Sequence, residues 1–230
     1  KIVVTLEARA GFWLDPTAEE VVLVDEIGNI YPPEEFLPLM VALMLKSRAK
    51  GAFAVPVSAP SVIEQMTAEN GCSVRRTKSA ERSMIETAIS PEVVMAGTMG
   101  GRFAFPKFQA AFDGMFTIAK TIELSATAGV PLSKVLKDVP RRTFLQGRVP
   151  CVWDKKGGIM RKMSEDSLEL EATFIDGIKV NFGQDWVLVL PDQYQPVIHV
   201  VAEAKEPKTA HRLLDEYMQK VDRWKKELPI

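Results

Sequence analysis

The sequence predicts an α/β protein in which a doubly wound part is followed by a smaller α+β part with an antiparallel sheet and a long terminal helix. Up to about residue 140, short apolar runs alternate with helical patterns, which is typical of a parallel sheet covered by helices. After residue 141, strand-like runs follow one another and an amphipathic pattern closes the chain.

The elements of the first part are expected in a regular order. The run 2–6 is strand-like, and the apolar run 21–24, the turn residues 25–29 and Ile30-Tyr31 predict a hairpin. Pro32-Pro33-Glu34-Glu35 begins a helix, since proline and acids favour a first turn, and residues 36–45 are apolar nearly all round. Further strands are expected at 52–57, 72–76 and 93–96, and further helices at 61–69 and 81–88.

Two residues mark the ends of one more predicted helix. Asp113 suits an N-cap because its side chain accepts hydrogen bonds from the first amides, and Gly129 suits the left-handed position after the last turn. In the second part, strands are expected at 173–179, 186–190 and 197–204, with turns at Asp176-Gly177 and 183–185. The Pro- and Arg-rich stretch 140–150 predicts the boundary between the two parts. The stripe that marks the closing helix consists of Ala210, Leu213, Leu214, Tyr217, Val221, Trp224 and Leu228.

Composition excludes several classes of function. The 230 residues carry 29 basic and 30 acidic side chains, so the chain lacks the basic excess that favours nucleic acid or an anionic membrane. Its longest apolar run is too short to span a bilayer, and we expect a cytoplasmic protein. Cys72 and Cys151 have no partner at metal spacing and are expected to be reduced thiols. The start at Lys1, without Met, suggests a fragment of a longer chain.

Short stretches with a recognisable order lie at 21–28, 76–78, 97–106, 113–114 and 176–180. Together they resemble successive landmarks of the phosphoglucomutase/phosphomannomutase family, the α-D-phosphohexomutases. The resemblance implies that residues 1–31 end the second mutase domain, that 32–140 form the third and that 141–230 form the fourth. Residues 149–161 look more narrowly like the degenerate mutase-like region of bacterial mannose-1-phosphate guanylyltransferase fusion proteins.

The metal loop of the family is altered here. Active relatives carry Asp-Gly-Asp-Ala-Asp-Arg, whose three carboxylates hold magnesium, whereas this chain has Asp15-Pro16-Thr17-Ala18-Glu19-Glu20. The resemblance therefore implies a degenerate site made of Asp15 and Glu19, and we expect no cofactor in this fragment. An exposed acidic turn before a strand is the alternative interpretation.

The sugar-binding loop is altered as well. The family places Gly-Glu-Glu-Ser-Gly-His before an aromatic strand, while this chain has Gly97-Thr98-Met99-Gly100-Gly101-Arg102. Both acids are absent and Arg102 takes the histidine position. The resemblance implies a remnant sugar-phosphate site of Lys78, Arg82, Thr98 and Arg102, because guanidinium and ammonium groups bind phosphate. A surface arginine beside a glycine turn is the alternative.

The family's phosphate loop, Arg-Pro-Ser-Gly-Thr-Glu-Pro, corresponds to residues 190–196. Here the arginine, both hydroxyls and the glycine are absent, and Asp192 would repel a phosphate. His199 follows in an apolar strand, where a hydrogen-bonded core histidine is the simpler interpretation than a base. We therefore expect no ligand at this loop and assign no catalytic residue.

Two functions remain open. The first is a non-catalytic module of a sugar-1-phosphate nucleotidyltransferase that serves assembly or senses a sugar phosphate. The alternative is a residual phosphomannomutase or phosphoglucomutase whose phosphoserine domain lies upstream of Lys1. Either function implies a hexose phosphate and the remainder of a longer chain as partners, leaves a homo-oligomer open, and excludes nucleic acid and membrane.

Overall fold

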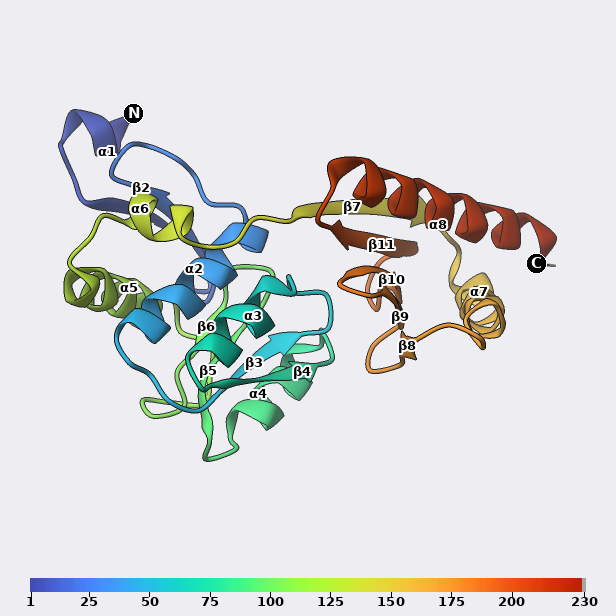
Figure 1. The fold of residues 1–230 in the computed structure, drawn as a ribbon, viewed down its shortest axis with the longest axis horizontal. Coiled ribbons are helices and arrows are strands. Elements are labelled where there is room, and N and C mark those ends of the chain that lie inside the picture. The colour runs from blue at the N-terminus through green and yellow to red at the C-terminus, as the bar shows by residue number, and fades with distance from the viewer. Residues whose placement is uncertain (229–230) are drawn as a thin grey trace. The chain divides into compact units, whose positions relative to one another are not determined.

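The computed structural model describes residues 1–228 and divides into two compact units, Lys1–Pro140 and Arg141–Ile230. Figure 1 follows the chain from the first unit, in blue and green, to the second, in yellow and red. Each unit has its own hydrophobic core, built only from its own residues. The predicted combination of a doubly wound part with an α+β part is confirmed.

A four-stranded sheet of order β4-β3-β5-β6 forms the centre of unit 1. β3 (Ala52–Pro56), β4 (Ser73–Thr77) and β5 (Val93–Gly97) are parallel, and β6 (Phe103–Ala104) is antiparallel to β5. β3 lies between two neighbours and is buried on both faces, so its sequence is apolar throughout.

Helices cover both faces of this sheet. Phe53 and Val55 of β3 pack into the core that is shared with α2 (Pro33–Lys46), α3 (Val62–Glu69), α5 (Gly114–Ala128) and α6 (Leu132–Lys137). Ala52 and Ala54 face the opposite way, towards α4 (Glu81–Ala88). Small residues on one face and large ones on the other allow α4 to approach the sheet closely.

The predicted helix ends in unit 1 are confirmed. The Asp113 carboxylate accepts a hydrogen bond from the Phe116 amide at 2.8 Å and caps α5. Gly129 follows the helix with φ +65°, in the left-handed conformation that glycine adopts without strain.

The beginning of the chain differs from the prediction. Residues 2–6 do not form a strand, because no neighbouring strand pairs with them; Ile2–Thr5 is a single helical turn, α1. β1 (Ala10–Leu14) was not predicted, and it is the antiparallel partner of β2 (Val21–Asp25). The predicted pairing of 21–24 with Ile30 is reduced to one bridge between Val24 and Ile30.

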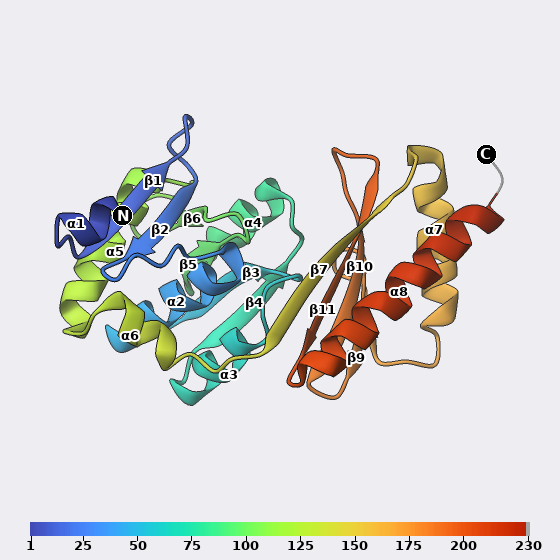
Figure 2. The same ribbon diagram turned by 90° about the horizontal axis from the view of Figure 1, so that it is seen from above.

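The strands of unit 2 are β7 (Thr143–Pro150), β8 (Ala172–Thr173), β9 (Ile178–Phe182), β10 (Asp185–Pro191) and β11 (Val197–Ala204). They form an antiparallel sheet of order β7-β11-β10-β9-β8. α8 (Pro207–Glu227) packs against β7, β11 and β10 through the predicted apolar stripe, and Figure 2 shows this helix beside β7 and β11. α7 (Trp153–Asp166) contacts α8 and the neighbouring strands β9 and β10.

Three expectations for unit 2 were incomplete. The stretch 140–150 is mostly β7, an edge strand whose glycine, arginine and proline obscure the strand pattern. α7 was missed because Gly157 and Gly158 weaken its helical signal. The expected strand 173–179 is divided, because Asp176-Gly177 makes a tight turn inside it and Gly177 adopts φ +70°.

Two further expectations concern thiols and membranes. Cys72 and Cys151 are free thiols, the first half-buried and the second buried. Among residues 1–228, no helix combines the length and the apolar character that crossing a bilayer requires.

Candidate functional site

A tight loop, residues 98–102, joins β5 to β6 in unit 1. The Thr98 hydroxyl oxygen accepts hydrogen bonds from the amides of Gly100, at 3.1 Å, and Arg102, at 3.3 Å. Gly101 has φ +77°, and a Cβ atom there would lie 2.4 Å from the Val21 carbonyl oxygen. Thr98 and Gly101 therefore fix the loop against β2 and orient the Arg102 side chain.

Arg102 lies among three carboxylates. Its guanidinium group forms an ion pair with Glu81 at the start of α4. Glu19 is 3.5 Å away and Glu20 is 3.8 Å away, both from the segment that precedes β2. A backbone bridge between Glu20 and Arg102 holds the two segments together. The segment before β2 and the loop 98–102 thus meet through their charged side chains.

The other two predicted cations, Lys78 and Arg82, are more exposed than Arg102. The Arg82 side chain is 89% exposed and pairs with Glu86 one turn along α4, at 2.8 Å. Lys78, just after β4, is exposed, and its ammonium group makes no ion pair within the described part of the chain. Arg102 and Arg82 thus each have acidic partners, and the site of Lys78, Arg82, Thr98 and Arg102 stays a prediction.

The Asp15 carboxylate accepts hydrogen bonds from residues of its own turn. The donors are the Thr17 hydroxyl and the amides of Thr17, Glu19 and Glu20. The Thr17 hydroxyl and these amides together outweigh desolvation and lower the pKa of Asp15.

The residues of this turn do not fit a magnesium ion. The oxygens of Asp15 are already occupied, and Glu19 faces a guanidinium group that would repel a cation. Within residues 1–228, no group of three His, Cys, Asp or Glu side chains is arranged to hold a metal. We assign no chemistry to a metal at Asp15 and Glu19.

Unit 2 carries a second polar cluster, in the loop after β10. The Asp192 carboxylate accepts hydrogen bonds from the amides of Tyr194 and Gln195, at 2.7 and 2.8 Å, and lies 2.7 Å from Nε2 of His199. Desolvation raises the pKa of Asp192, but the hydrogen bonds from His199 and from the two amides outweigh it and lower the pKa to about 2. His199 has a carboxylate partner, as expected of a hydrogen-bonded core histidine.

Lys156, on α7, binds the carbonyl groups of this loop. Its ammonium group donates hydrogen bonds to the carbonyl oxygens of Asp192, at 2.6 Å, and Gln195, at 2.5 Å. The same group lies 3.7 Å from the centre of the Trp153 ring, and the residue is buried. The loop therefore has an internal cation bound to its backbone.

Sequence reasoning missed Lys156 and the acidic partners of Arg102. One signal was available for Lys156, because it precedes Ile159 and Met163 on the buried face of α7, where a lysine requires a partner. Glu19 and Glu20 are distant from Arg102 in sequence, and no local pattern connects them.

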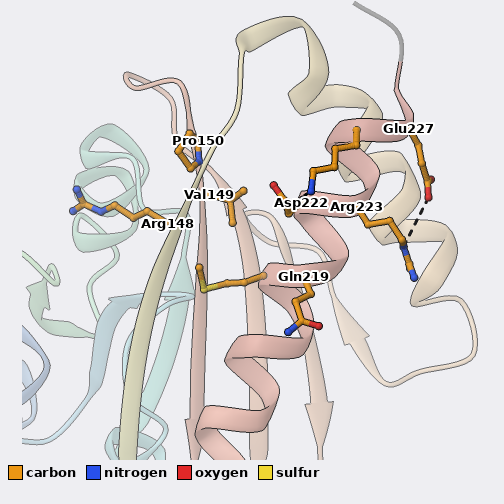
Figure 3. Close-up of a pocket in the computed structure, with 9 residues that line it drawn as sticks. Arg148, Val149, Pro150, Gln219, Asp222, Arg223 and Glu227 are labelled. Atoms are coloured by element: carbon orange, nitrogen blue, oxygen red, sulfur yellow. Dashed lines mark ion pairs between the residues drawn. The ribbon is translucent and has the colours of Figure 1, made fainter.

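A groove of about 650 Å³ lies elsewhere in unit 2, between the end of β7 and the C-terminal half of α8 (Figure 3). Val149 and Met218 provide apolar lining, while the charged groups along α8 pair with one another. Arg223 lies 3.8 Å from Glu227, and Asp222 lies 2.6 Å from Lys226. The groove therefore offers no concentrated charge for a phosphate.

Sequence comparison links the chain to sugar-phosphate mutases. Residues 32–143 match the family model described as phosphoglucomutase/phosphomannomutase, alpha/beta/alpha domain III. A probable phosphoglucosamine mutase of Pyrococcus horikoshii is 29% identical over 219 residues, which cover 93% of this chain and 48% of the relative. One of Methanosarcina barkeri is 30% identical over 207 residues, covering 90% and 46%. The chain thus spans about half the length of the curated relatives it matches.

Comparison with solved structures also finds mutases. A phosphoglucomutase/phosphomannomutase family protein from Burkholderia thailandensis aligns with a TM-score of 0.82 at 20% identity, covering 97% of this chain and 48% of that one. The Aspergillus fumigatus N-acetylphosphoglucosamine mutase, solved with GlcNAc-6P and magnesium, aligns with a TM-score of 0.69 at 13% identity, covering 94% and 48%. Residues 32–143 therefore resemble domain III of the phosphoglucomutase/phosphomannomutase family, and the chain has a mutase-like fold.

Proposed function

We propose that this chain is a phosphohexomutase-family module that does not catalyse phosphoryl transfer and instead has a structural role or senses a sugar phosphate weakly. The observation that carries the proposal is the position of Arg102 between Glu19, Glu20 and Glu81. An arginine that is already paired with acids is a poor ligand for a further anion.

Electrostatics supports this interpretation. Two unit charges about 4 Å apart interact by about 4 kcal/mol at an effective dielectric constant near 20. A phosphate that approached Arg102 would meet three carboxylates around one guanidinium group, so repulsion would offset the attraction. We expect a dissociation constant no tighter than about 1 mM, which corresponds to about 4 kcal/mol of binding free energy.

The loop in unit 2 supports the same conclusion. Its carbonyl groups face the Lys156 ammonium and its amides face the Asp192 carboxylate, so both kinds of backbone group are engaged inside the chain. A phosphate would have to displace Asp192 from the amides of Tyr194 and Gln195.

Titration of glucosamine 6-phosphate into the 230-residue chain, followed by amide NMR shifts, tests the proposal. We expect only weak shifts at 97–102 and none at 192–195. Glu81→Gln removes one partner of Arg102 and should enlarge the shifts, whereas the control Glu86→Gln affects only Arg82 and should not. Saturation at micromolar concentration that Arg102→Ala abolishes would disprove the proposal.

One observation favours a second function, a residual mutase. Probable phosphoglucosamine mutases resemble this chain over 90% or more of its length. This function requires a phosphoserine domain in the same protein, so the sequence upstream of Lys1 is the first test. Conversion of glucosamine 6-phosphate by the longer protein, lost on Asp15→Asn, would establish it.

The association with a sugar-1-phosphate nucleotidyltransferase stays a prediction that depends on residues 149–161 alone. These residues end β7 and begin α7, and they include Trp153 and Lys156, which serve the loop at Asp192. Formation of GDP-mannose from GTP and mannose 1-phosphate by the longer protein is the direct test.

A further inference from the structure

A small pocket of about 360 Å³ lies within unit 1, apart from the Arg102 cluster. It is formed by the end of α2, the segment between α2 and β3, the beginning of β5, the segment after β6 and the first half of α5. Its volume lies in the range of small-molecule sites, which begins at about 300 Å³. Six of its lining residues are aromatic or cationic: Lys50, Phe105, Lys107, Phe108, Phe116 and Lys120.

The aromatic rings form a continuous apolar wall. The rings of Phe108 and Phe116 are stacked, with centroids 4.0 Å apart and planes 5° apart. Phe105 packs against Phe116 at 5.4 Å. Phe108 is 58% exposed, so a large planar surface remains accessible to a ligand in the part of the chain that the structure describes. Such a surface favours a flat aromatic group.

The charged lining residues are all basic, and no carboxylate lines the pocket among the described residues. Lys107 is exposed and makes no ion pair within residues 1–228. Lys50 donates a hydrogen bond to the Asn70 carbonyl oxygen, which leaves its positive charge uncompensated. Lys120 contacts Glu123 at 2.9 Å, and that carboxylate is itself 62% exposed. The rim therefore favours an anionic group.

The pocket and the Arg102 cluster lie at opposite ends of the sheet. Ala49 and Lys50 precede the parallel strand β3, whereas the loop 98–102 follows the carboxyl end of β5. β6 pairs Phe103 with Gly97 and Ala104 with Ala96, so its continuation through Phe105 runs back towards the amino ends of the strands. A ligand in this pocket would not contact Arg102.

We propose that this pocket binds a nucleoside phosphate, with the base against the phenylalanine wall and the phosphates at the lysines. Stacking on the aromatic wall accounts for the planar part of the ligand, and charge complementarity accounts for the anionic part. The inference is independent of the function proposed for the Arg102 cluster, because none of its residues belongs to that cluster.

Three probes separate the two halves of the proposed ligand. ADP, adenosine and pyrophosphate are titrated into the full 230-residue chain, and the amide signals of Ala49, Val94 and Lys107 are followed by NMR. We expect ADP to bind more tightly than either of the other two. Phe108→Ala should weaken ADP about tenfold through lost stacking, and Lys107→Gln about threefold through one lost charge contact. Lys137→Gln, an exposed lysine on α6, is the control and should leave ADP binding unchanged.

Each outcome decides for or against the proposal. Phe108→Leu keeps an apolar side chain and should restore folding if Phe108→Ala impairs it, while ADP binding stays weak. Equal binding of ADP and pyrophosphate would overturn the nucleotide assignment, since the rings would then contribute nothing. Shifts confined to residues 97–102, or equally reduced by Lys137→Gln, would overturn the pocket itself.

Discussion

Arg102 connects segments of unit 1 that lie far apart in the sequence. Its side chain is 25% exposed and reaches acids from the segment before β2 and from α4. The arginine therefore compensates charge on three glutamates that would otherwise repel one another.

Removing this charge should destabilise unit 1. We expect Arg102→Gln to lower the free energy of unfolding by about 1 kcal/mol at pH 7, since Glu19, Glu20 and Glu81 lose their shared cation. Urea titrations measure this difference. Arg82→Gln, at an exposed pair on α4, is the control and should change stability by less than about 0.5 kcal/mol. An equal loss in both variants would mean that Arg102 is only a surface arginine.

Asp192 predicts a defined pH dependence. Its pKa is lowered from 3.8 to about 2, so the carboxylate contributes stability above about pH 4 and loses it as the pH falls through 2. We expect Asp192→Asn to cost about 2 kcal/mol of unfolding free energy at pH 7. The gap between the two proteins should narrow between pH 4 and pH 2.

Chemical unfolding at a series of pH values measures this gap. Asp215→Asn, at an exposed carboxyl on α8, provides the comparison and should stay within about 0.5 kcal/mol of the wild type. A gap that is constant down to pH 2 would contradict the role of Asp192 as a charged partner of His199.

At the scale of elements, local patterns predicted much of the fold. α4 and β11 were expected within the observed limits, and Asp113 and Gly129 located the ends of α5, because capping and burial act within a few residues. β7 was not predictable in this way. Its identity as a strand depends on pairing with β11, more than 40 residues later.

The candidate site was less predictable than the fold. The sequence predicts that the loop at 190–196 binds no phosphate, but the contacts inside this loop depend on Lys156, which lies on another element. The same holds for Arg102, whose partners come from two distant segments. The clusters at Arg102 and Asp192 both depend on contacts between residues that are distant in the sequence. A single sequence does not show which distant residues are in contact.

Lys156 should be essential for the loop that it supports. Lys156→Met keeps the apolar stem but leaves the carbonyl groups of Asp192 and Gln195 without their donor, so we expect a loss of about 2 kcal/mol in unfolding free energy. Arg161→Met, on the exposed face of the same helix, should cost less than about 0.5 kcal/mol. Thermal unfolding of the two variants gives the comparison, and an unchanged melting temperature for Lys156→Met would contradict this role.

At the scale of the whole molecule, the two units have separate cores. The buried residues of the first core lie between Val21 and Val139, and those of the second lie between Val149 and Trp224. A cavity can therefore be introduced into either core without altering the other one.

A matched pair of substitutions tests this separation. Val55→Ala and Val200→Ala each remove two methyl groups from a fully buried strand position, and each should cost about 1–3 kcal/mol. Amide hydrogen exchange should accelerate mainly in residues 1–140 for the first variant and mainly in residues 141–228 for the second. Equal acceleration in both units by either variant would show that they unfold as one cooperative body.

The ammonium group of Lys156 has a consequence for any redesign of the loop at 190–196. A new loop that turned the carbonyl groups of Asp192 and Gln195 away from α7 would leave a buried cation without its acceptors, and replacing Lys156 alone would leave these carbonyl groups without their donor. The lysine and the loop therefore have to be changed together.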